Sequence, residues 1–405
     1  MKPFPTGVAL ADALQIIGDI GATRRLPTEA VGLARAHGRV LADDLVASID
    51  LPPFDNSAMD GFAVRHADLS VTDDSRLRLA GEQFAGTATY APVAPGTCLR
   101  ITTGAAVPPD ADTVVIKEVV RDAGDHIVVR PGTVAGANIR KAGEDVRAGD
   151  VVLRAGDALT PARVSLAAAL GHARLEVAAR PTVAVFTTGD ELVEPGLPLA
   201  PGQIYNSNRE LLMGLLRADG LEPTAWPTLP DDPSRVAAAL RDAAAAFDLV
   251  LTCGAVSAGE KDHIPALVSQ HGRLHFWKVR MKPGMPVLFG EIDRALLLGL
   301  PGNPVSVLAT WLVIGRALCD EIQGRREPRP QWRAQLTTAI TTSHTRCEFL
   351  RGSLHSDDDG TLRVTPHPAT GSHRLRAAAQ ADALVRIPEG PCHLSVGDAV
   401  DVIPY

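Results

Sequence analysis

Glycine, serine and acidic residues gather in three short segments of the chain, each directly after an apolar run. The segments are residues 187–192, 253–262 and 301–306, and the runs before them are typical of buried strands. Glycine lets a backbone approach a phosphate, serine donates hydrogen bonds, and carboxylates can hold a metal ion that neutralises the phosphate. Ordinary turn chemistry would explain any one segment alone. Three of them at one sheet edge favour a phosphate or nucleotide site.

Three cations alternate along a fourth segment. Lys278, Arg280 and Lys282 occupy every second position of a predicted strand that leads into Pro283-Gly284. Alternate residues of a strand point to one face, so the three side chains are expected to form one cationic lining for an oxyanion or a phosphate. Solvated lysines on an edge strand are the alternative.

The segment at residues 51–63 is unusual because polar residues interrupt an apolar loop that fits neither helix nor strand. Asp55 and Asn56 can fix one Asx-turn, and Asp60-Gly61 another. From the residues alone, a structural loop and a binding site both remain open.

The elements that must position these groups follow a strand–helix rhythm between residues 180 and 325. Strands are predicted at 183–186, 248–252 and 296–300, and helices at 209–218, 233–247 and 303–322. Asp231 or Asp232 is expected to cap the second helix, with Pro233 just inside its start. This alternation predicts a doubly wound parallel sheet covered on both faces, with right-handed crossovers. Ligands of such sheets bind beyond the carboxyl ends of the strands.

The remaining segments predict smaller domains around this α/β core, so the fold class is α/β multidomain. Residues 8–20 have helical spacing with Thr6 as a possible N-cap, and residues 139–178 are predicted to be helical, above all at 162–170. Short β-type runs at 113–116 and 126–129 indicate an inserted small β domain, and the last 75 residues a C-terminal β-barrel with a hairpin turn at 357–360. The predicted domains are residues 1–54 with 139–179 (helical linker domain), 55–138 (inserted β domain), 180–325 (central α/β domain) and 326–405 (β-barrel).

The composition is that of a soluble globular protein, with 45% hydrophobic and 21% charged residues. No apolar run approaches the roughly 18 residues that span a bilayer, and the N-terminus lacks the pattern of a signal peptide. The five cysteines have no paired spacing, which argues against a zinc site or disulfides and favours the cytoplasm. A net charge of −7 without a basic run excludes a nucleic-acid footprint, so neither nucleic acid nor membrane is expected as a partner.

Taken together, these segments resemble the molybdopterin molybdenumtransferase family, which includes the catalytic domain of gephyrin. The most specific strings are Pro-Phe-Asp-Asn-Ser-Ala-Met-Asp-Gly at 53–61 and Pro-Gly-Asn-Pro-Val-Ser at 301–306. The other matching segments, in order, are 103–105, 138–140, 143–145, 188–191, 231–233, 256–257, 282–284, 349–352 and 371–373.

The resemblance implies an elongated homodimer that converts adenylylated molybdopterin and molybdate to molybdenum cofactor and AMP, with Mg²⁺ assisting. A pterin adenylyltransferase and molybdoenzyme acceptors are the implied partners. The adenylyl group makes the pterin phosphate a good leaving site, so the protein need only position and neutralise anions.

The resemblance also implies roles for residues at matching positions. The catalytic set would be Asp60, Asp190, Glu191, Asp262, Lys278 and Lys282, with Glu191 and Asp262 as metal ligands and Asp60 entering from the partner subunit. The cofactor-binding set would be Thr103, Arg140, Gly254, Ser257, Asn303, Ser306, Arg351 and Ser372. Within it, Gly254, Ser257, Asn303 and Ser306 would face phosphates, whereas Arg351 and Ser372 would join Lys278 and Lys282 in contacting molybdate and phosphate.

The chain departs from the family pattern at four positions: Ala255 replaces the second glycine of a pair, Met285 a lysine, Ala377 a serine and Asp382 an asparagine. A cation lost from an oxyanion site removes charge-assisted hydrogen bonds of about 1.5–3 kcal/mol. The departures suggest a divergent paralogue with lowered molybdate affinity, and tungstate in place of molybdate also remains open.

Three other functions compete with this one. A non-catalytic or weakly active molybdopterin-binding scaffold of the same fold is the main alternative. A pterin adenylyltransferase would lack the 55–61 domain and the barrel. A nucleotide-dependent kinase would need the Gly-x-x-x-x-Gly-Lys loop, which the chain lacks.

Overall fold

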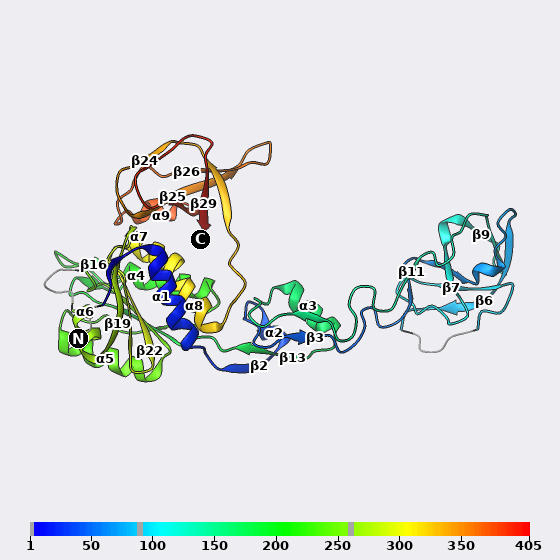
Figure 1. Ribbon diagram of the computed structural model, residues 1–405, viewed down its shortest axis with the longest axis horizontal. Coiled ribbons are helices and arrows are strands. Elements are labelled where there is room, and N and C mark those ends of the chain that lie inside the picture. Colours follow the sequence, from blue (N-terminus) through cyan, green and yellow to red (C-terminus); the bar gives the residue numbers. More distant parts are fainter. Residues whose placement is uncertain (1–3, 87–91, 258–262) are drawn as a thin grey trace.

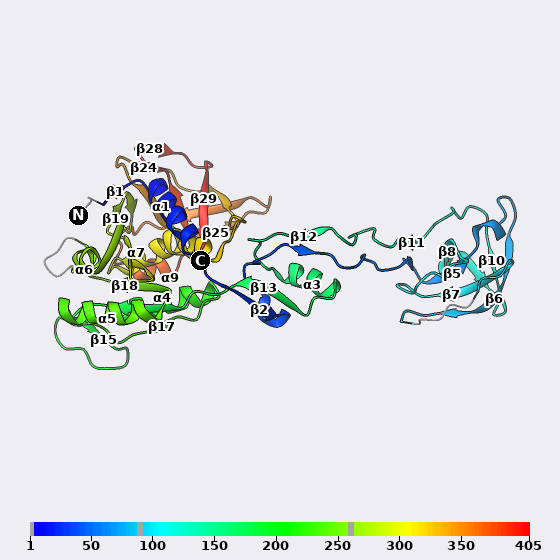
Figure 2. The ribbon, with the colours of Figure 1, turned by 60° about the horizontal axis from the view of Figure 1, so that its bottom comes forward.

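The computed structural model describes residues 4–86, 92–257 and 263–405. Figure 1 shows an elongated molecule, with an α/β domain and a β-barrel at one end and a small β domain at the other. Two extended stretches of chain run between these ends past a small linker region, as Figure 2 shows from a second side. The multidomain α/β fold class is confirmed.

The central sheet has seven strands in the order β1-β19-β21-β22-β18-β14-β17. Its middle strands are β14 (Val183–Thr187), β18 (Leu249–Cys253) and β22 (Ala295–Leu300), which pair in parallel and are buried along their whole lengths. Continuous apolar runs suit strands that are covered on both faces. The three predicted strands are therefore confirmed.

The sheet is mixed rather than wholly parallel. β21 (Leu288–Ile292) runs antiparallel between β22 and β19 (Gly272–Val279), because only Asp293 and Arg294 separate β21 from β22. A connection of two residues permits a hairpin but not a parallel crossover. Parallel pairing returns at the edges with β1 (Thr6–Val8) and β17 (Thr224–Ala225).

Helices cover both faces of this sheet. The core on one face joins Val183 and Val185 to α1 (Leu10–Thr23), α4 (Ser207–Ala218), α7 (Pro304–Thr310) and α8 (Arg316–Gln323). The core on the other face joins Ala184 and Phe186 to α5 (Pro233–Ala246) and α6 (Ile264–His271). Because side chains alternate between the two faces of β14, its residues pack into two separate cores.

The helix predicted at 8–20 exists, but its predicted cap and its predicted neighbours are wrong. Thr6 lies in β1, and α1 begins at Leu10 after Ala9, with no side chain capping it. The helix packs on α8 of the central domain rather than on the linker, and a Cβ at Gly21 would lie 2.6 Å from that of Glu321. Glycine at position 21 allows this close approach.

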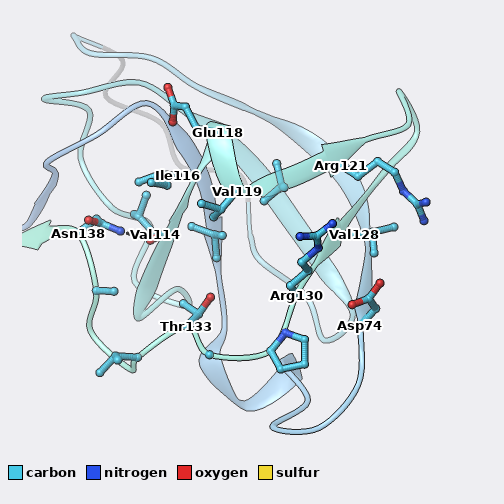
Figure 3. Close-up of a pocket in the computed structure, with 16 residues that line it drawn as sticks. Asp74, Val114, Ile116, Glu118, Val119, Arg121, Val128, Arg130, Thr133 and Asn138 are labelled. Carbon is cyan, nitrogen blue, oxygen red and sulfur yellow. Dashed lines mark hydrogen bonds between the residues drawn. The ribbon is translucent and has the colours of Figure 1, made fainter.

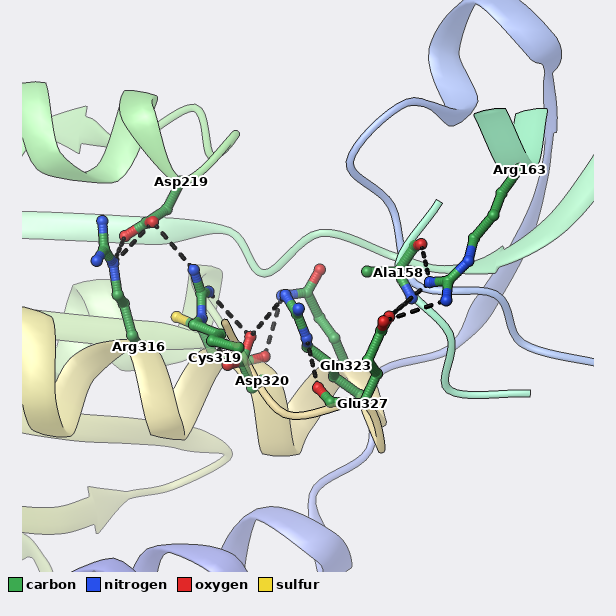
Figure 4. A network of polar contacts seen from close by, with 10 residues as sticks. Ala158, Arg163, Asp219, Arg316, Cys319, Asp320, Gln323 and Glu327 are labelled. Atoms are coloured by element: carbon green, nitrogen blue, oxygen red, sulfur yellow. Dashed lines mark hydrogen bonds and ion pairs between the residues drawn. The ribbon is translucent and has the colours of Figure 1, made fainter. Parts of the chain in front are cut away.

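The closing helix predicted at 303–322 is confirmed as one helical run from α7 to α8, with a π-helical turn at Trp311–Gly315. A polar network follows it into the chain that leads to the barrel (Figure 4). Asp219, at the end of α4, accepts hydrogen bonds from Trp311 Nε1 (2.8 Å) and Arg316 Nε (2.9 Å). Glu327 pairs with Arg163 of the linker at 2.5 Å.

The linker region is more extended than expected. Only α3 (Pro161–Ala169) and the short α2 (Leu33–Ala36) are helical, which confirms the helix predicted at 162–170 but not helix over 139–178. The remainder pairs as antiparallel ladders. These join β2 (Thr28–Gly32) to β13 (Arg174–Ala178), β3 (Leu45–Val46) to β12 (Val151–Leu153) and β4 (Asn56–Ser57) to β11 (Ile139–Arg140).

The small β domain is a six-stranded sheet in the order β8-β5-β7-β6-β10-β9. The strands predicted at 113–116 and 126–129 are β8 and β10. The other bounds are β5 (Gly61–Val64), β6 (Ser75–Gln83), β7 (Thr97–Ile101) and β9 (Val120–Asp122), with short 3₁₀ turns at His66–Asp68 and Lys117–Val119.

The C-terminal region is a closed five-stranded barrel, as predicted. Its ring is β25 (Cys347–Ser356), β26 (Leu362–Pro366), β23 (Trp332–Leu336), β29 (Ala399–Pro404) and β27 (Ala383–Ile387), which pairs back with β25. The turn predicted at 357–360 joins β25 to β26, with Gly360 at φ 81°. Three short elements complete it: α9 (Leu375–Ala379), β24 (Ile340–Thr342) and β28 (Cys392–Leu394). Among the described residues, no helix is long and apolar enough to cross a membrane.

Candidate active site

A pocket of about 610 Å³ opens where β14, β18 and β22 end at their carboxyl ends. All three predicted loops contribute to its wall, because parallel strands deliver their following loops to one edge. Its residues are Thr187, Thr188, Gly189, Glu191, Leu192, Ile204, Tyr205, Asn206, Ser207, Asn208, Asp231, Cys253, Gly254, Ala255, Val256, Ser257, Pro286, Pro301, Gly302, Asn303 and Pro304. Of the predicted site residues, the pocket therefore brings together Glu191, Gly254, Ser257 and Asn303.

The backbone on the pocket floor is tightly constrained. Gly254 has φ 102°, and a Cβ there would lie 2.8 Å from Thr188 Oγ1. Ala255 follows with φ 53°, a left-handed conformation that disfavours side chains. Beside them, burial raises the pKa of the Cys253 thiol to about 12. A thiol that stays protonated cannot serve as a nucleophile, so the floor is a binding surface.

The acidic side of the pocket consists of Glu191 and Asp231. Asp190 does not line the pocket, and its Oδ1 accepts a hydrogen bond from the backbone N–H of Asp231 at 3.2 Å. Asp262, a predicted catalytic residue and metal ligand, lies outside the described residues. Among those that are described, no group of three or more His, Cys, Asp and Glu side chains could hold a metal ion by itself.

The three alternating cations do not lie on one strand, so that prediction is wrong. Lys278 lies inside β19 with φ 65°, and its Nζ lies 4.4 Å from the centre of the Trp277 ring. Arg280 pairs with Glu389 at 2.5 Å. Lys282 belongs to β20 (Met281–Lys282), which joins the barrel, and its Nζ lies 2.7 Å from Glu348. Strand period alone could not foresee that β19 ends at Val279, which leaves Arg280 between the central sheet and the sheet of the barrel.

Lys278 nevertheless lies beside the pocket wall. The indole Nε1 of Trp277, over which the ammonium group sits, donates to the backbone oxygen of Val256 at 2.8 Å. Val256 itself lines the pocket. The ammonium is therefore held by a cation–π contact next to the loop that carries Gly254 and Ser257.

The start of α7 connects the pocket to the barrel. Asn303 does not cap the helix; its Nδ2 instead donates to Ser372 Oγ at 3.0 Å, and Val305 N donates to Ser372 O at 3.1 Å. Ser372 is thereby fixed against the pocket rim. Ser306, the third residue of α7, is buried and is not among the residues that line the pocket.

Arg351 is the most unusual cation of this region. Its side chain is 3% exposed, its Nη2 donates to the backbone oxygen of Ala369, and its Nε has no partner among the described residues. Burial lowers the pKa of the guanidinium. The neighbouring groups that act on this guanidinium are Tyr405 and Arg374, and no carboxylate of the described residues is among them. A buried cation without a counter-charge is costly unless an anion joins it.

Asp60 and Thr103 form a second cluster on the small β domain. Asp60 Oδ1 accepts hydrogen bonds from Thr103 N and Thr103 Oγ1, both at 2.9 Å, and Oδ2 lies 3.2 Å from Lys117 Nζ. These bonds from Thr103 and then Lys117 lower the pKa of Asp60 to about 2. Arg140 is exposed on β11 near this domain. Figure 1 shows the strands beside these residues, β7 and β11, at the opposite end of the molecule from β22 and α7.

Several site residues escaped the sequence reasoning. Asn206 caps α4 and, with Tyr205, Ser207 and Asn208, forms one wall of the pocket. The signal for Asn206 was its place directly before a helical run, where asparagine is a preferred N-cap. Lys117 gave no comparable signal, because its contact with Asp60 spans 57 positions of sequence.

A larger cavity, about 710 Å³, lies in the small β domain (Figure 3). Valines form much of its lining, and the charged groups labelled at its rim are Asp74, Glu118, Arg121 and Arg130. None of the predicted site residues lines it. The pocket of the central sheet has the glycine-rich loops and helix starts suited to phosphates, and we take it as the candidate active site.

Comparison with known proteins agrees with this architecture over nearly the whole chain. Three family descriptions match in succession: "MoeA N-terminal region (domain I and II)" at residues 8–171, "Probable molybdopterin binding domain" at 184–320 and "MoeA C-terminal region (domain IV)" at 333–405. The second covers the pocket of the central sheet.

Curated relatives and a solved structure extend the agreement. The chain is 36% identical to the molybdopterin molybdenumtransferase of Haemophilus influenzae, covering 93% of this chain and 94% of that protein. It is 39% identical to molybdopterin molybdenumtransferase 2 of Mycobacterium tuberculosis, covering 92% and 94%. The molybdopterin biosynthesis moeA protein of Pyrococcus horikoshii OT3 superposes with a TM-score of 0.83 at 31% identity, over 98% of this chain and 100% of that one. With its motifs, its barrel and its inserted β domain all in register with these relatives, the chain belongs to the molybdopterin molybdenumtransferase family.

Proposed function

We propose that this enzyme inserts molybdate into adenylylated molybdopterin and releases molybdenum cofactor and AMP. The pocket at the carboxyl ends of β14, β18 and β22 carries the proposal, because it joins glycine-rich loops to a helix start and to a seam with the barrel. The relatives give no support to the scaffold alternative, since those named above are called transferases.

The chain's own groups suit recognition of a doubly anionic substrate. The Gly254 backbone admits close approach of a phosphate, Ser257 and Asn208 offer polar contacts, and Lys278 supplies positive charge beside them. Arg351 offers an uncompensated guanidinium at the barrel, near the loop that holds Ser372. Fixed donors of this kind stabilise the charge that develops on the departing phosphate without reorganising.

The reaction then depends chiefly on placement. Asn303 and Ser372 hold the barrel loop against the start of α7, so the groups of two domains face one cleft. Holding the oxyanion beside the pterin sulfurs converts an encounter of two substrates into a step within one complex. Burial raises the pKa of the Cys253 thiol to about 12, so the proposal assigns it no chemical step.

Mg²⁺ is part of the proposal, and the acidic residues fit it. Glu191 and Asp231 both line the pocket. Mg²⁺ in phosphate sites typically takes one or two carboxylates and completes its shell with water and phosphate oxygens. Glu191 would be the first ligand, with Asp262 as the predicted second. When bound, the ion would neutralise the phosphoanhydride.

A homodimer is the second part of the proposal. The Asp60–Thr103–Lys117 cluster belongs to the small β domain, which lies at the opposite end of the molecule from the central α/β domain (Figure 1). A two-fold arrangement of elongated chains would bring this cluster to the partner's pocket. We further propose cytoplasmic location, transfer of substrate from a pterin adenylyltransferase and delivery of product to molybdoenzymes.

Activity is tested by AMP release from adenylylated molybdopterin as molybdate is titrated, with tungstate in parallel. Asp60→Ala, Asp262→Ala and Lys282→Ala are each expected to lower AMP release at least tenfold, with Asp74→Ala, in the other cavity, as the control. Unchanged activity in all three variants would contradict the assignment of these residues to the active site. Binding of molybdopterin without turnover would instead favour the scaffold.

The shared site is tested by mixing two inactive variants, Asp60→Ala and Glu191→Ala. Random exchange makes half of the dimers mixed, and each mixed dimer has one intact site, so activity returns to about one quarter of wild type. If mixing restores nothing although the subunits have exchanged, the two clusters do not meet across a dimer.

A further inference from the structure

Glu348 is a buried carboxylate at the seam between β20 and the barrel. Parallel pairing of β20 with β25 sets Lys282 opposite Glu348. Lys282 Nζ lies 2.7 Å from one carboxylate oxygen, and His344 Nε2 lies 2.9 Å from the other. The Glu348 side chain is only 6% exposed, so these two groups supply most of the stabilisation of its charge.

The hydrogen bonds also fix the tautomer of His344. The backbone N–H of Arg346 donates to His344 Nδ1 at 3.3 Å, which makes Nδ1 an acceptor. Nε2 therefore carries the ring proton and donates it to Glu348. In this state His344 is neutral and Lys282 is the cation that balances Glu348.

We propose that Glu348 and His344 are positioning residues for Lys282, and that transfer of Lys282 to an oxyanion is accompanied by proton uptake at His344. This inference rests on the proposed function for the assignment of Lys282 to molybdate. When the ammonium turns to the anion, Glu348 keeps its charge in a buried place and loses its cation. A proton from solvent binds Nδ1, the Arg346 N–H gives up that acceptor, and imidazolium replaces ammonium beside Glu348.

The surroundings leave His344 as the group that responds. The charged residues on the elements packed here are Lys282 on β20, Arg280 before it, Arg346 beside the ring, Arg386 on β27 and Glu389 after it. Arg280 and Glu389 already form an ion pair at 2.5 Å, and Arg386 lies 3.9 Å from Asp401. His393, on the neighbouring β28, is bonded to Thr341 at 2.9 Å, so His344 is the imidazole that contacts Glu348.

The coupling sets the sign of the pH dependence. If the complex holds one more proton than the free protein, molybdate affinity falls as pH rises, by up to about tenfold per pH unit. A purely structural role for His344 would change stability but would not couple a proton to the anion. Proton uptake is thus the measurement that separates the two.

The experiment is calorimetric titration of the full-length protein with molybdate alone, between pH 6 and 8, in buffers of different ionisation heat. Wild type is expected to take up close to one proton and to weaken about tenfold per pH unit. His344→Gln keeps a hydrogen-bond donor for Glu348 but cannot be protonated. Glu348→Gln removes the buried negative charge that Lys282 leaves without a cation. Both should bind with no proton uptake and with less than a twofold change over this range, whereas Lys282→Ala should lose binding.

His355→Gln is the matched control, since His355 lies at the other end of β25 and is 48% exposed. It should behave as wild type, and thermal unfolding shows whether each variant is folded. Equal proton uptake in wild type and His344→Gln would overturn the inference, as would binding without uptake or no molybdate binding. AMP release is measured in parallel to distinguish the two proposals. AMP release without coupled proton uptake would contradict the inference but not the proposed function. Coupled proton uptake without AMP release would contradict the proposed function but not the inference.

Discussion

At the scale of single residues, the pocket depends on a few backbone and charge states that neighbouring chemistry fixes. Ala255 holds a left-handed conformation, Met285 stands where the family resemblance predicts a lysine, and Asp60 is kept ionised by Thr103 and Lys117. Each of these states can be changed by one substitution.

Ala255→Gly is expected to stabilise the fold slightly. A left-handed conformation costs a residue with a Cβ about 1–2 kcal/mol, and the extra freedom of glycine in the unfolded chain offsets about 0.4–1 of this. The expected gain of about 0.5–1 kcal/mol would be measured by urea unfolding. Ala200→Gly is the control, because Ala200 is exposed and does not have positive φ. Destabilisation by Ala255→Gly would show that the methyl group packs usefully.

Met285→Lys is expected to lower the KM for molybdate. Met285 is 41% exposed and adjoins Pro286 of the pocket wall, so a lysine there could reach the anion. Solvent screening reduces the value of such a contact, and we expect an improvement of about three- to tenfold. Val71→Lys adds the same charge on the exposed β domain and should leave the KM unchanged. No improvement would contradict the idea that this position limits molybdate affinity.

Asp60 should remain charged throughout the working pH range. Its pKa is lowered from 3.8 to about 2. The bonds to the ionised carboxylate therefore stabilise the folded protein above pH 3.8, and this stabilisation is lost as the pH falls through about 2. Carbon-13 NMR of the carboxyl group would follow this titration directly. In Thr103→Val, which removes one hydroxyl donor, the midpoint should move upward. A midpoint near 4 in the wild-type protein would rule out the Thr103 and Lys117 bonds.

At the scale of elements, the N-termini of helices both support the core and line the pocket. Asp232 caps α5, as predicted, and its Oδ1 accepts from Ser234 N at 2.9 Å and Arg235 N at 3.3 Å. These bonds satisfy two of the N–H groups that a helix leaves open. At the starts of α4 and α7, Asn206 and Asn303 line the pocket, and Asn206 also caps its helix by accepting from Arg209 N.

Asp232→Ala should therefore cost stability without touching the site. Loss of an N-cap destabilises by about 1 kcal/mol, which urea unfolding can resolve. Asp242→Ala, on the exposed face of the same helix, removes an equal charge and should stay within about 0.5 kcal/mol of wild type. Equal losses in the two variants would mean that charge rather than capping matters.

At the scale of the whole molecule, contacts at the junction hold three regions in register. Asp219 binds Trp311 and Arg316 from the helical run, and Arg329 on the way to the barrel lies 3.4 Å away. Glu327 reaches Arg163 of the linker (Figure 4). The distance between the Asp60 cluster and a partner's pocket depends on this junction.

Asp219→Ala is expected to destabilise the protein by about 3 kcal/mol, because it leaves buried donors without their charged acceptor. Glu327→Gln, at a pair about one-third exposed, should cost at most about 1 kcal/mol but should speed hydrogen exchange in β2 and β13. Thermal unfolding and exchange mass spectrometry measure the two effects. A larger loss from Glu327→Gln than from Asp219→Ala would contradict this ranking.

The sequence by itself determined the central strands, most helices, the barrel and the loops of the pocket. Buried strands are continuous apolar runs, helix starts carry their own caps, and parallel strands bring their loops to one edge, so local pattern suffices. The family strings at 53–61 and 301–306 added the reaction. Beyond these, local pattern misjudged the neighbours of α1, whose place on α8 depends on the contact of Gly21 with Glu321, 300 positions away.

The tertiary structure alone decided where the charges lie. Lys278, Arg280 and Lys282 each contact a different partner. Arg351 is buried without a carboxylate beside it, and Glu348 contacts both His344 and Lys282. The fold also brings Asp60 to Lys117 at the far end of the molecule. Ion pairs and burial depend on residues distant in sequence, so they do not follow from periodicity.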